Sequence, residues 1–293
     1  ESPLVPGLIY IGTDDGNLQV TRDDGSTWEN VVDQIPGLPD RTYVSRVEAS
    51  SHADGRVYAT FDGHRNGDYA PYVYLSEDYG QTWHGPDASD ECSFYYLGDN
   101  VFQDMISTFP QVYSDECDGF EYYINDFWSY YDFDYKVDAN GDIHILMSVV
   151  PSDDYYIFWI DGAGWYHFTI DSDYLDNPGP INTETGWNWS FVMRGDATWS
   201  FNDLTGDTYI WNKSSSLAFS KDNPDIVYAV SNMATPGSPA DASVFEDPCY
   251  VTLMSDYPEW SEDIYVIKSD DGGVTWWNPL NVSNTPDNTG GVC

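Results

Sequence analysis

Basic residues are scarce in this chain of 293 residues: ten lysines and arginines stand against 50 aspartates and glutamates, and the formal net charge is −40 at pH 7. Such a chain repels phosphate backbones and anionic lipids, so we expect no nucleic-acid partner. No apolar run is long enough to cross a membrane as a helix, and we expect no membrane insertion. The acidic surface suits solubility in a salty or extracellular medium, while clustered carboxylates leave Ca²⁺ binding open and no other cofactor is required.

Cysteine is also rare, and no Cys-x-x-Cys pair supports a zinc or redox motif. An even number of cysteines in such a chain predicts two disulfides in an oxidising compartment. Of the three pairings that four cysteines allow, one joining near neighbours in the sequence is the natural choice. The pairs would be Cys92 with Cys117 and Cys249 with Cys293.

Three Asn-x-Ser sequons fit a secreted, extracellular or cell-surface protein, although chance explains them nearly as well. They are at Asn188, Asn212 and Asn281. No signal peptide is visible, and Glu1 resembles a mature or trimmed N-terminus.

Recognisable catalytic motifs are missing as well. The chain has no Gly-x-Ser-x-Gly nucleophile motif, no nucleotide-binding loop and no haem-attachment motif. Its five histidines are scattered, and strand or turn positions explain them. They are His52, His64, His84, His144 and His167.

Aromatic residues are plentiful instead: they make up 17% of the chain, with 24 tyrosines and 12 tryptophans. Gly, Asn, Asp, Ser and Thr are also frequent, and no long stretch has apolar residues at helical spacing. This composition predicts an all-β protein of many short strands joined by tight turns.

One eight-residue pattern, Ser/Thr-x-Asp-x-Gly-x-Thr-Trp, occurs three times, at Thr21–Trp28, Ser76–Trp83 and Ser269–Trp276. In each copy the Asp can accept bonds from backbone N–H groups, and the Gly allows a positive φ. We therefore expect three tight hairpins, with each Trp packed between neighbouring sheets.

This pattern resembles the Asp-box, and the chain resembles the Asp-box (BNR-repeat) β-propellers. The resemblance implies that the boxes have a structural role in hairpins. Their residues are Asp23, Gly25 and Trp28, then Asp78, Gly80 and Trp83, and finally Asp271, Gly273 and Trp276.

Two regions carry further resemblances. Residues 5–83 resemble bacterial sortilin/VPS10-type propellers through IYIGTDDG, RTYVSRVEAS and VYATFDGHRNGDY. Residues 137–288 resemble secreted sialidase-like propellers through GDIHILMS, NPDIVYAV and DIYVIKSDDGGVTW.

The resemblance implies a single β-propeller domain over residues 1–293, built from four-stranded antiparallel blades. We expect six blades, with seven as the alternative. Residues 84–135 would form a degenerate blade, and Trp165–Ile170 the last strand of the next one. Residues 1–7 would be an N-terminal arm, 231–262 a long insertion, and 284–293 a tail that closes the first blade.

The segment Asp138-Ala139-Asn140-Gly141-Asp142 has two readings. Its Asn-Gly pair predicts a hairpin turn. Asp138, Asn140 and Asp142 also resemble a Ca²⁺ loop, although the Gly and distal Glu of an EF-hand are absent from their expected positions.

Sialidases of this fold need three arginines that bind the substrate carboxylate, and Lys cannot replace them. This chain has only six arginines, and their family's Arg-Ile-Pro motif is replaced by Leu4-Val5-Pro6. The one basic cluster forms a candidate ligand rim of Arg41, Arg46, Glu48, His64 and Arg65. The alternative is that Arg46 and Glu48 form a structural pair in the central channel.

We therefore expect no catalytic residues and a non-enzymatic extracellular module for adhesion, surface attachment or matrix assembly. Its partners would be other protein chains, including copies of itself. A glycan- or peptide-binding propeller is the alternative, and a sialidase-like or other glycoside hydrolase is the second alternative.

Overall fold

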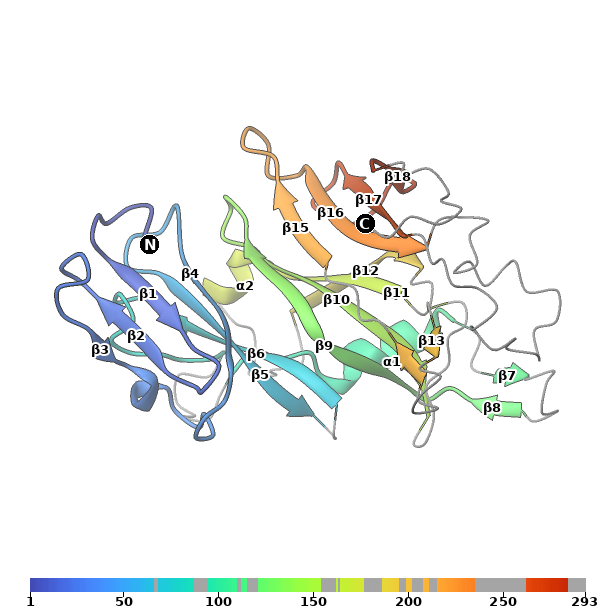
Figure 1. Cartoon of the computed structure of the whole chain (residues 1–293), viewed down its shortest axis with the longest axis horizontal. Coiled ribbons are helices and arrows are strands. Elements are labelled where there is room, and N and C mark those ends of the chain that lie inside the picture. The colour runs from blue at the N-terminus through green and yellow to red at the C-terminus, as the bar shows by residue number, and fades with distance from the viewer. Residues whose placement is uncertain are drawn as a thin grey trace. The chain divides into compact units, whose positions relative to one another are not determined.

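The computed structural model describes residues 1–65, 68–86, 94–109, 112–114, 121–153, 162, 164–176, 186–194, 199–201, 208–210, 215–234 and 262–283 (Figure 1). These residues are mostly strands, so the prediction of an all-β chain is confirmed. Helical structure in this part is limited to α1 (Asp99–Ser107), α2 (Ser172–Asp176) and a 3-10 turn at Val32–Gln34. No helix here is long and apolar enough to span a membrane.

The chain divides into two compact units. The first comprises Glu1–Phe102, Tyr135–Ile145 and Phe168–Trp189. The second comprises Gln103–Asp134, Leu146–His167 and Ser190–Cys293.

The first unit begins with two antiparallel meanders. One contains β1 (Ile9–Gly12), β2 (Leu18–Thr21) and β3 (Glu29–Asn30), in that order. The other contains β4 (Val44–Ala49), β5 (Val57–Arg65) and β6 (Asp68–Ser76). Beyond β6, single antiparallel bridges join Val73 to Tyr95 and Leu75 to His84, so β6 also has neighbours on its far side.

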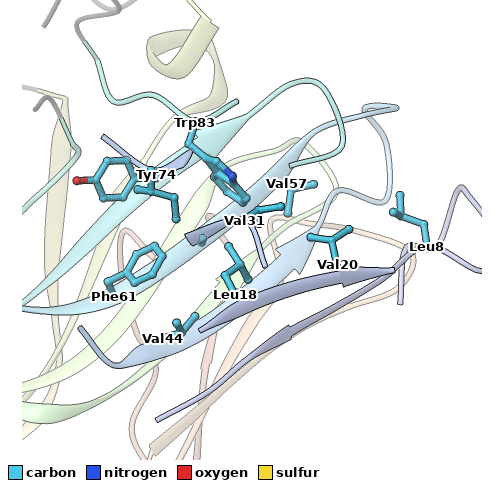
Figure 2. Close-up of a cluster of buried hydrophobic side chains, with 11 residues drawn as sticks. Leu8, Leu18, Val20, Val31, Val44, Val57, Phe61, Tyr74 and Trp83 are labelled. Carbon is cyan, nitrogen blue, oxygen red and sulfur yellow. The ribbon is translucent and has the colours of Figure 1, made fainter. Parts of the chain in front are cut away.

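Alternating apolar residues of these strands form one core, drawn in Figure 2. In β5, Val57, Ala59 and Phe61 are fully buried in it, which is the period of two that a strand imposes. Phe61 meets Tyr74 of β6 edge to face, with ring centroids 5.8 Å apart. Since successive side chains of a strand point to opposite faces, β5 directs Tyr58 and Thr60 away from this core.

A four-stranded sheet follows in the order β12-β11-β10-β9, formed by Asp126–Val137 (β9), Ile143–Ser152 (β10), Gly164–Ile170 (β11) and Trp187–Arg194 (β12). The boundaries between the two units fall within these strands. Every residue of β10 is buried, as expected for a central strand covered on both faces.

The second unit contains another four-stranded antiparallel sheet, formed by Ser215–Phe219 (β15), Val227–Ala234 (β16), Glu262–Ser269 (β17) and Leu280–Asn281 (β18). Its core includes Leu217, Val227 and Ile267. Two short antiparallel pairs complete the described strands, β7 (Val112–Ser114) with β8 (Glu121–Tyr123) and β13 (Trp199–Phe201) with β14 (Thr208–Ile210).

One expected strand position is wrong. Trp165–Ile170 was predicted to be the last strand of its sheet, but β11 lies between β10 and β12. Six of the seven residues of β11 are buried, whereas an outermost strand would alternate between buried and exposed positions. Helix α1 also interrupts the stretch that was expected to form a degenerate blade.

Several expectations concern residues outside the described part of the chain. These are the four cysteines, the tail 284–293, residues 235–261 of the insertion and the sequon at Asn212. The arm at residues 1–7 folds back on itself: Ser2 N donates to Leu8 O at 2.8 Å, and Ser2 Oγ accepts the N–H of Val5 at 3.2 Å.

Candidate functional site

The turn at Ser76–Trp83 is held by its own Asp. Asp78 Oδ1 accepts the N–H of Thr82 at 2.8 Å, and Oδ2 accepts Thr82 Oγ1 at 2.7 Å. Ser76 Oγ donates to Asp78 at 3.0 Å and accepts the N–H of Gly80 at 2.9 Å. Both carboxylate oxygens therefore serve the turn.

The other two copies of the pattern make the matching bonds. Asp23 accepts the N–H and the hydroxyl of Thr27 at 2.8 and 2.7 Å, and Asp271 accepts those of Thr275 at 2.9 and 2.6 Å. Bonds from Thr27 lower the pKa of Asp23. At Asp271 burial acts to raise the pKa, but the bonds from Thr275 outweigh it and the pKa is again lowered.

The same turns need two consecutive residues with positive φ. The residue before the Gly has φ near +60 to +70°, at Asp24 (58°), Tyr79 (63°) and Gly272 (73°). The N–H of each of these residues donates to a carbonyl in the loop that precedes a neighbouring strand. The bonds are Asp24 to Gly7 O at 3.0 Å, Tyr79 to Gly55 O at 2.8 Å and Gly272 to Asp225 O at 2.8 Å. We call Thr21–Trp28, Ser76–Trp83 and Ser269–Trp276 the repeat turns. Their carboxylates hold backbone, and the chemistry of a site must be sought elsewhere.

The Asp138–Asp142 segment also forms a turn in which an Asp carboxylate accepts backbone N–H groups. Asp138 Oδ1 accepts the N–H groups of Asn140 and Asp142 at 2.8 and 3.0 Å, and Gly141 has φ +92°. Asp138 Oδ2 lies 3.8 Å from His144 Nε2, and both side chains are buried. Burial acts to raise the pKa of Asp138, but His144 and the two N–H groups lower it overall. Among the described residues, no group of three or more His, Cys, Asp or Glu side chains is arranged to hold a metal ion.

Strands β4 and β5 place polar side chains on the face opposite the core. Arg46 is paired with Thr60 and Glu48 with Tyr58 in the antiparallel register, so all four share one face. Arg46 Nε lies 3.7 Å from Glu48 Oε2, and the two side chains are 38% and 26% exposed. We call these four residues and Asp62 the β4–β5 polar face.

Buried hydroxyls lie beneath the charged pair. Tyr58 and Thr60 are completely buried, and Tyr58 donates to Gly141 O over 3.5 Å. Burial raises the pKa of Tyr58 to about 12, against the opposing charge of Arg56. Tyr135 of β9, itself 1% exposed, lies close enough to Glu48 and Thr60 for both to affect its hydroxyl.

A second carboxylate belongs to the same face. Asp62 lies two residues beyond Thr60 on β5, and its carboxylate accepts a hydrogen bond from the hydroxyl of Ser45. A shift in the β4–β5 register between Val44 and Arg46 marks a bulge, which brings Ser45 to that side. A bulge in an edge strand commonly re-aims a side chain next to a site.

The candidate rim is therefore brought together only in part. Arg46 and Glu48 are neighbours, while Arg41 lies in the turn before β4 with φ +63°, its backbone against Gly16. His64 and Arg65 end β5, and their side chains are outside the described part. The alternation of β5 could have identified Thr60 and Asp62 from the sequence. Nothing local to Tyr135 could have identified it, because it comes from another sheet.

The two described sequons differ in what their Asn side chains do. Asn188 is exposed on β12. Asn281 Nδ2 instead donates to Asp263 Oδ2 at 2.6 Å, and Ser283 Oγ donates to the other oxygen of that buried carboxylate at 2.8 Å. The Asn281 sequon thus ties β18 to β17.

No known protein family matches the chain, and no curated protein matches it. Several solved structures resemble it, among them the following three. The alpha-L-arabinanase of Cellvibrio cellulosa is 10% identical, with a TM-score of 0.38, over 94% of this chain and 70% of that one. The xylan beta-1,4-xylosidase of Bacillus halodurans is 10% identical, with a TM-score of 0.39, over 95% and 40%. YCF48 of Cyanidioschyzon merolae is 13% identical, with a TM-score of 0.29, over 95% and 82%.

These comparisons correct the expected function. We predicted a non-enzymatic adhesion or assembly module and no enzyme, but the arabinanase and the xylosidase are named as glycoside hydrolases. The adhesion prediction is wrong on this finding and is withdrawn. The activities belong to those proteins, and a function for this chain has to be argued from its own residues.

Proposed function

We propose that the chain is a secreted Asp-box β-propeller with six blades that acts as a glycoside hydrolase on the β4–β5 polar face. The two four-stranded sheets and the three repeat turns support the fold assignment. Glycans would be its partners, and the acidic surface disfavours nucleic acid. The reaction needs no metal, and Ca²⁺ binding at Asp138, Asn140 and Asp142 remains a separate prediction.

One observation carries the functional proposal: two carboxylates and a guanidinium share one partly exposed face of β4 and β5. Glycoside hydrolysis requires a pair of carboxyl groups, one to donate a proton to the leaving oxygen and one to activate water or attack the sugar. Arginine and hydroxyl groups beside them provide hydrogen bonds to sugar hydroxyls. The apolar core on the opposite face of the sheet holds these side chains in place.

The register favours one stereochemical course. Glu48 lies opposite Tyr58, and Asp62 is four residues further along β5, so the two positions are separated by about 13 Å along the strand. A separation of that order is closer to the roughly 6.5–9.5 Å between the carboxyl groups of an inverting pair than to the ~5 Å of a retaining pair. Arg46 favours the ionised form of Glu48, which is the form that a general base needs.

Incubation with arabinan, xylan, aryl glycosides and sialosides tests the proposal, with products followed by proton NMR. We expect hydrolysis with inversion at the anomeric carbon, and a loss of about 10²- to 10⁴-fold in Glu48→Gln and in Asp62→Asn. Glu29→Gln is the matched control, because Glu29 is exposed on β3, where it accepts from Arg22 at 2.9 Å and from Gln34 at 3.4 Å. Cleavage unaffected by both substitutions would contradict this site, and binding without cleavage would favour the glycan-binding alternative.

A further inference from the structure

Tyr135 supplies a hydroxyl to the β4–β5 polar face from a different sheet. Its side chain is 1% exposed, and its hydroxyl oxygen is fully buried. Thr60, completely buried on β5, lies against it. The two hydroxyls lie close enough to interact with each other, and no other hydrogen bond reaches either of them within the described part of the chain.

Two buried hydroxyls with no partner besides each other cost stability, because each has given up hydrogen bonds to water that one neighbour does not replace. Apolar replacements of the same shape would remove that cost, so the hydroxyls need another explanation. Glu48 and Arg46 of the same face are close enough to act on the Tyr135 hydroxyl, and Glu48 Oε2 is itself buried. Buried polar groups in such a position are commonly bridged by an ordered water that makes two to four hydrogen bonds.

We propose that Tyr135 is a positioning residue: its hydroxyl, together with that of Thr60, holds a water molecule beneath Glu48 and thereby fixes the orientation of the Glu48 carboxylate. This inference rests on the proposed function of the polar face. Tyr135 does not touch the substrate. It acts through Glu48, in the way that second-layer hydrogen bonds hold a reacting side chain within its productive geometry.

The surroundings also exclude a more direct role for this tyrosine. Burial raises the pKa of Tyr135 well above its ordinary value, with smaller effects from Tyr58, Glu48, Arg46 and Thr60. The hydroxyl is therefore protonated and neutral, so it can donate a hydrogen bond and cannot serve as a phenolate nucleophile. A neutral donor near a carboxylate stabilises the charged form of that carboxylate.

The substitution Tyr135→Phe tests the inference, because it removes the hydroxyl and keeps the ring. Glu48 can be followed directly by NMR titration of carboxyl-labelled glutamate, with the signal assigned by its loss in Glu48→Gln. We expect the Glu48 midpoint to rise by about 0.5 to 1 pH unit in Tyr135→Phe, which is the size of one lost hydrogen bond to the carboxylate. Loss of the buried water would also be visible in a crystal structure of the variant.

Tyr95→Phe is the matched control. Tyr95 is also 1% exposed, belongs to the same unit and has a buried hydroxyl without an ordinary hydrogen bond among the described residues, but Glu48 is not among the charges that act on it. We expect Tyr95→Phe to leave the Glu48 titration unchanged. Equal midpoints in the wild type and both variants would overturn the positioning role.

The titration does not depend on hydrolysis, so the two proposals fail separately. A wild type that cleaves no glycan while Tyr135→Phe still shifts Glu48 would refute the hydrolase and keep the positioning role. If the wild type cleaves glycans, Tyr135→Phe should lower kcat and move the limb of the pH profile that reports Glu48, with KM nearly unchanged. Cleavage with an unaltered pH profile in this variant would refute the positioning role and keep the hydrolase.

Discussion

The repeat turns at Thr21–Trp28 and Ser76–Trp83 have the same internal bonds and different surroundings. In both, the Asp carboxylate accepts the N–H and the hydroxyl of the following Thr. Yet Trp83 is 4% exposed and belongs to the core of Figure 2, whereas Trp28 is 42% exposed. A Cβ on Gly80 would lie 3.2 Å from Tyr10 of β1, while on Gly25 it would meet only Trp28, at 3.9 Å.

The Trp of the third repeat turn shows which contacts a neighbouring sheet can provide. Trp276 Nε1 donates to Ser190 Oγ at 2.9 Å, and its ring meets His167 edge to face. Ser190 and His167 both lie against Gly273 O, at 2.5 and 3.2 Å. The turn is therefore a local structure that forms from its own eight residues, and its Trp stabilises the protein only where a neighbouring sheet receives it.

The largest expected effect comes from the tryptophans. Trp83→Ala should destabilise the protein by about 3–5 kcal/mol, because it removes a buried ring from a packed core. Trp28→Ala should cost less than about 1 kcal/mol, because that ring is largely in water already. Urea unfolding followed by circular dichroism measures both values. Equal losses would show that Trp28 is buried in solution.

Substitutions of the turn glycines should likewise cost more stability where a neighbouring side chain lies against the turn. Gly273→Ala forces a left-handed residue, at about 1–2 kcal/mol, and also drives a methyl group into the His167 ring, so we expect about 3 kcal/mol in total. Gly25→Ala meets only the Trp28 ring, at an ordinary contact distance of 3.9 Å, and should show only the conformational cost, about 1 kcal/mol. Thermal melts of the two variants side by side give the comparison, and a larger loss at Gly25 would contradict it.

The carboxylates of the turns should behave alike, because their bonds are local. Burial acts to raise the pKa of Asp78, but the bonds from Thr82, Ser76 and Gln81 lower it overall. A lowered folded pKa means that the stabilisation is complete above the unfolded value near ~4 and is lost as the pH falls through the folded value.

Asp78→Ala should therefore cost about 1–2 kcal/mol at pH 7 and progressively less as the pH falls from ~4 through the folded pKa. Unfolding curves of wild type and variant at several pH values should converge on acidification, and Asp23→Ala should show the same pH dependence. A gap that stays constant down to pH 2 would exclude the carboxylate as its source.

The smallest effect is expected at the surface. Arg22 pairs with Glu29 at 2.9 Å and also donates to Tyr79 O at 3.2 Å, which links the first repeat turn to the second. Arg22→Gln should cost less than about 1 kcal/mol, and most of that loss should disappear in 1 M salt, because both groups of the ion pair are exposed. A salt-independent loss would mean that the bond to Tyr79 O, and not the ion pair, is what matters.

The sequence predicted what is decided within a few residues. The turn bonds of Asp23, Asp78 and Asp271 follow from the eight-residue pattern, and the pairing of Arg46 with Glu48 follows from alternation along one strand. It could not predict what depends on neighbours distant in the chain. The difference between Trp28 and Trp83 is not encoded in their own octets.

The order of strands in a sheet and the buried hydroxyls beneath Arg46 and Glu48 also depend on residues distant in the chain. Strands that are almost wholly buried, such as β10 and β11, lose the alternation that would mark their order in a sheet, and Trp165–Ile170 was misplaced for that reason. Tyr135 reaches the polar face from β9, and no motif around it signals this. The predicted function relied on the scarcity of arginine, which bears only on the binding of a substrate carboxylate and not on other glycoside chemistry.

At the Asn281–Ser283 sequon, glycosylation of Asn281 competes with the pairing of β18 and β17. Once β18 has paired with β17, Asn281 Nδ2 and Ser283 Oγ are both occupied by the buried carboxylate of Asp263. A glycosylating host could modify Asn281 only before that hairpin closes, and a glycan attached in time would prevent it from closing in this form. The fraction of Asn281 that carries a glycan would then report how fast β18 pairs with β17 relative to glycosylation. The glycan occupancy of Asn188, which is exposed on β12, provides the reference value.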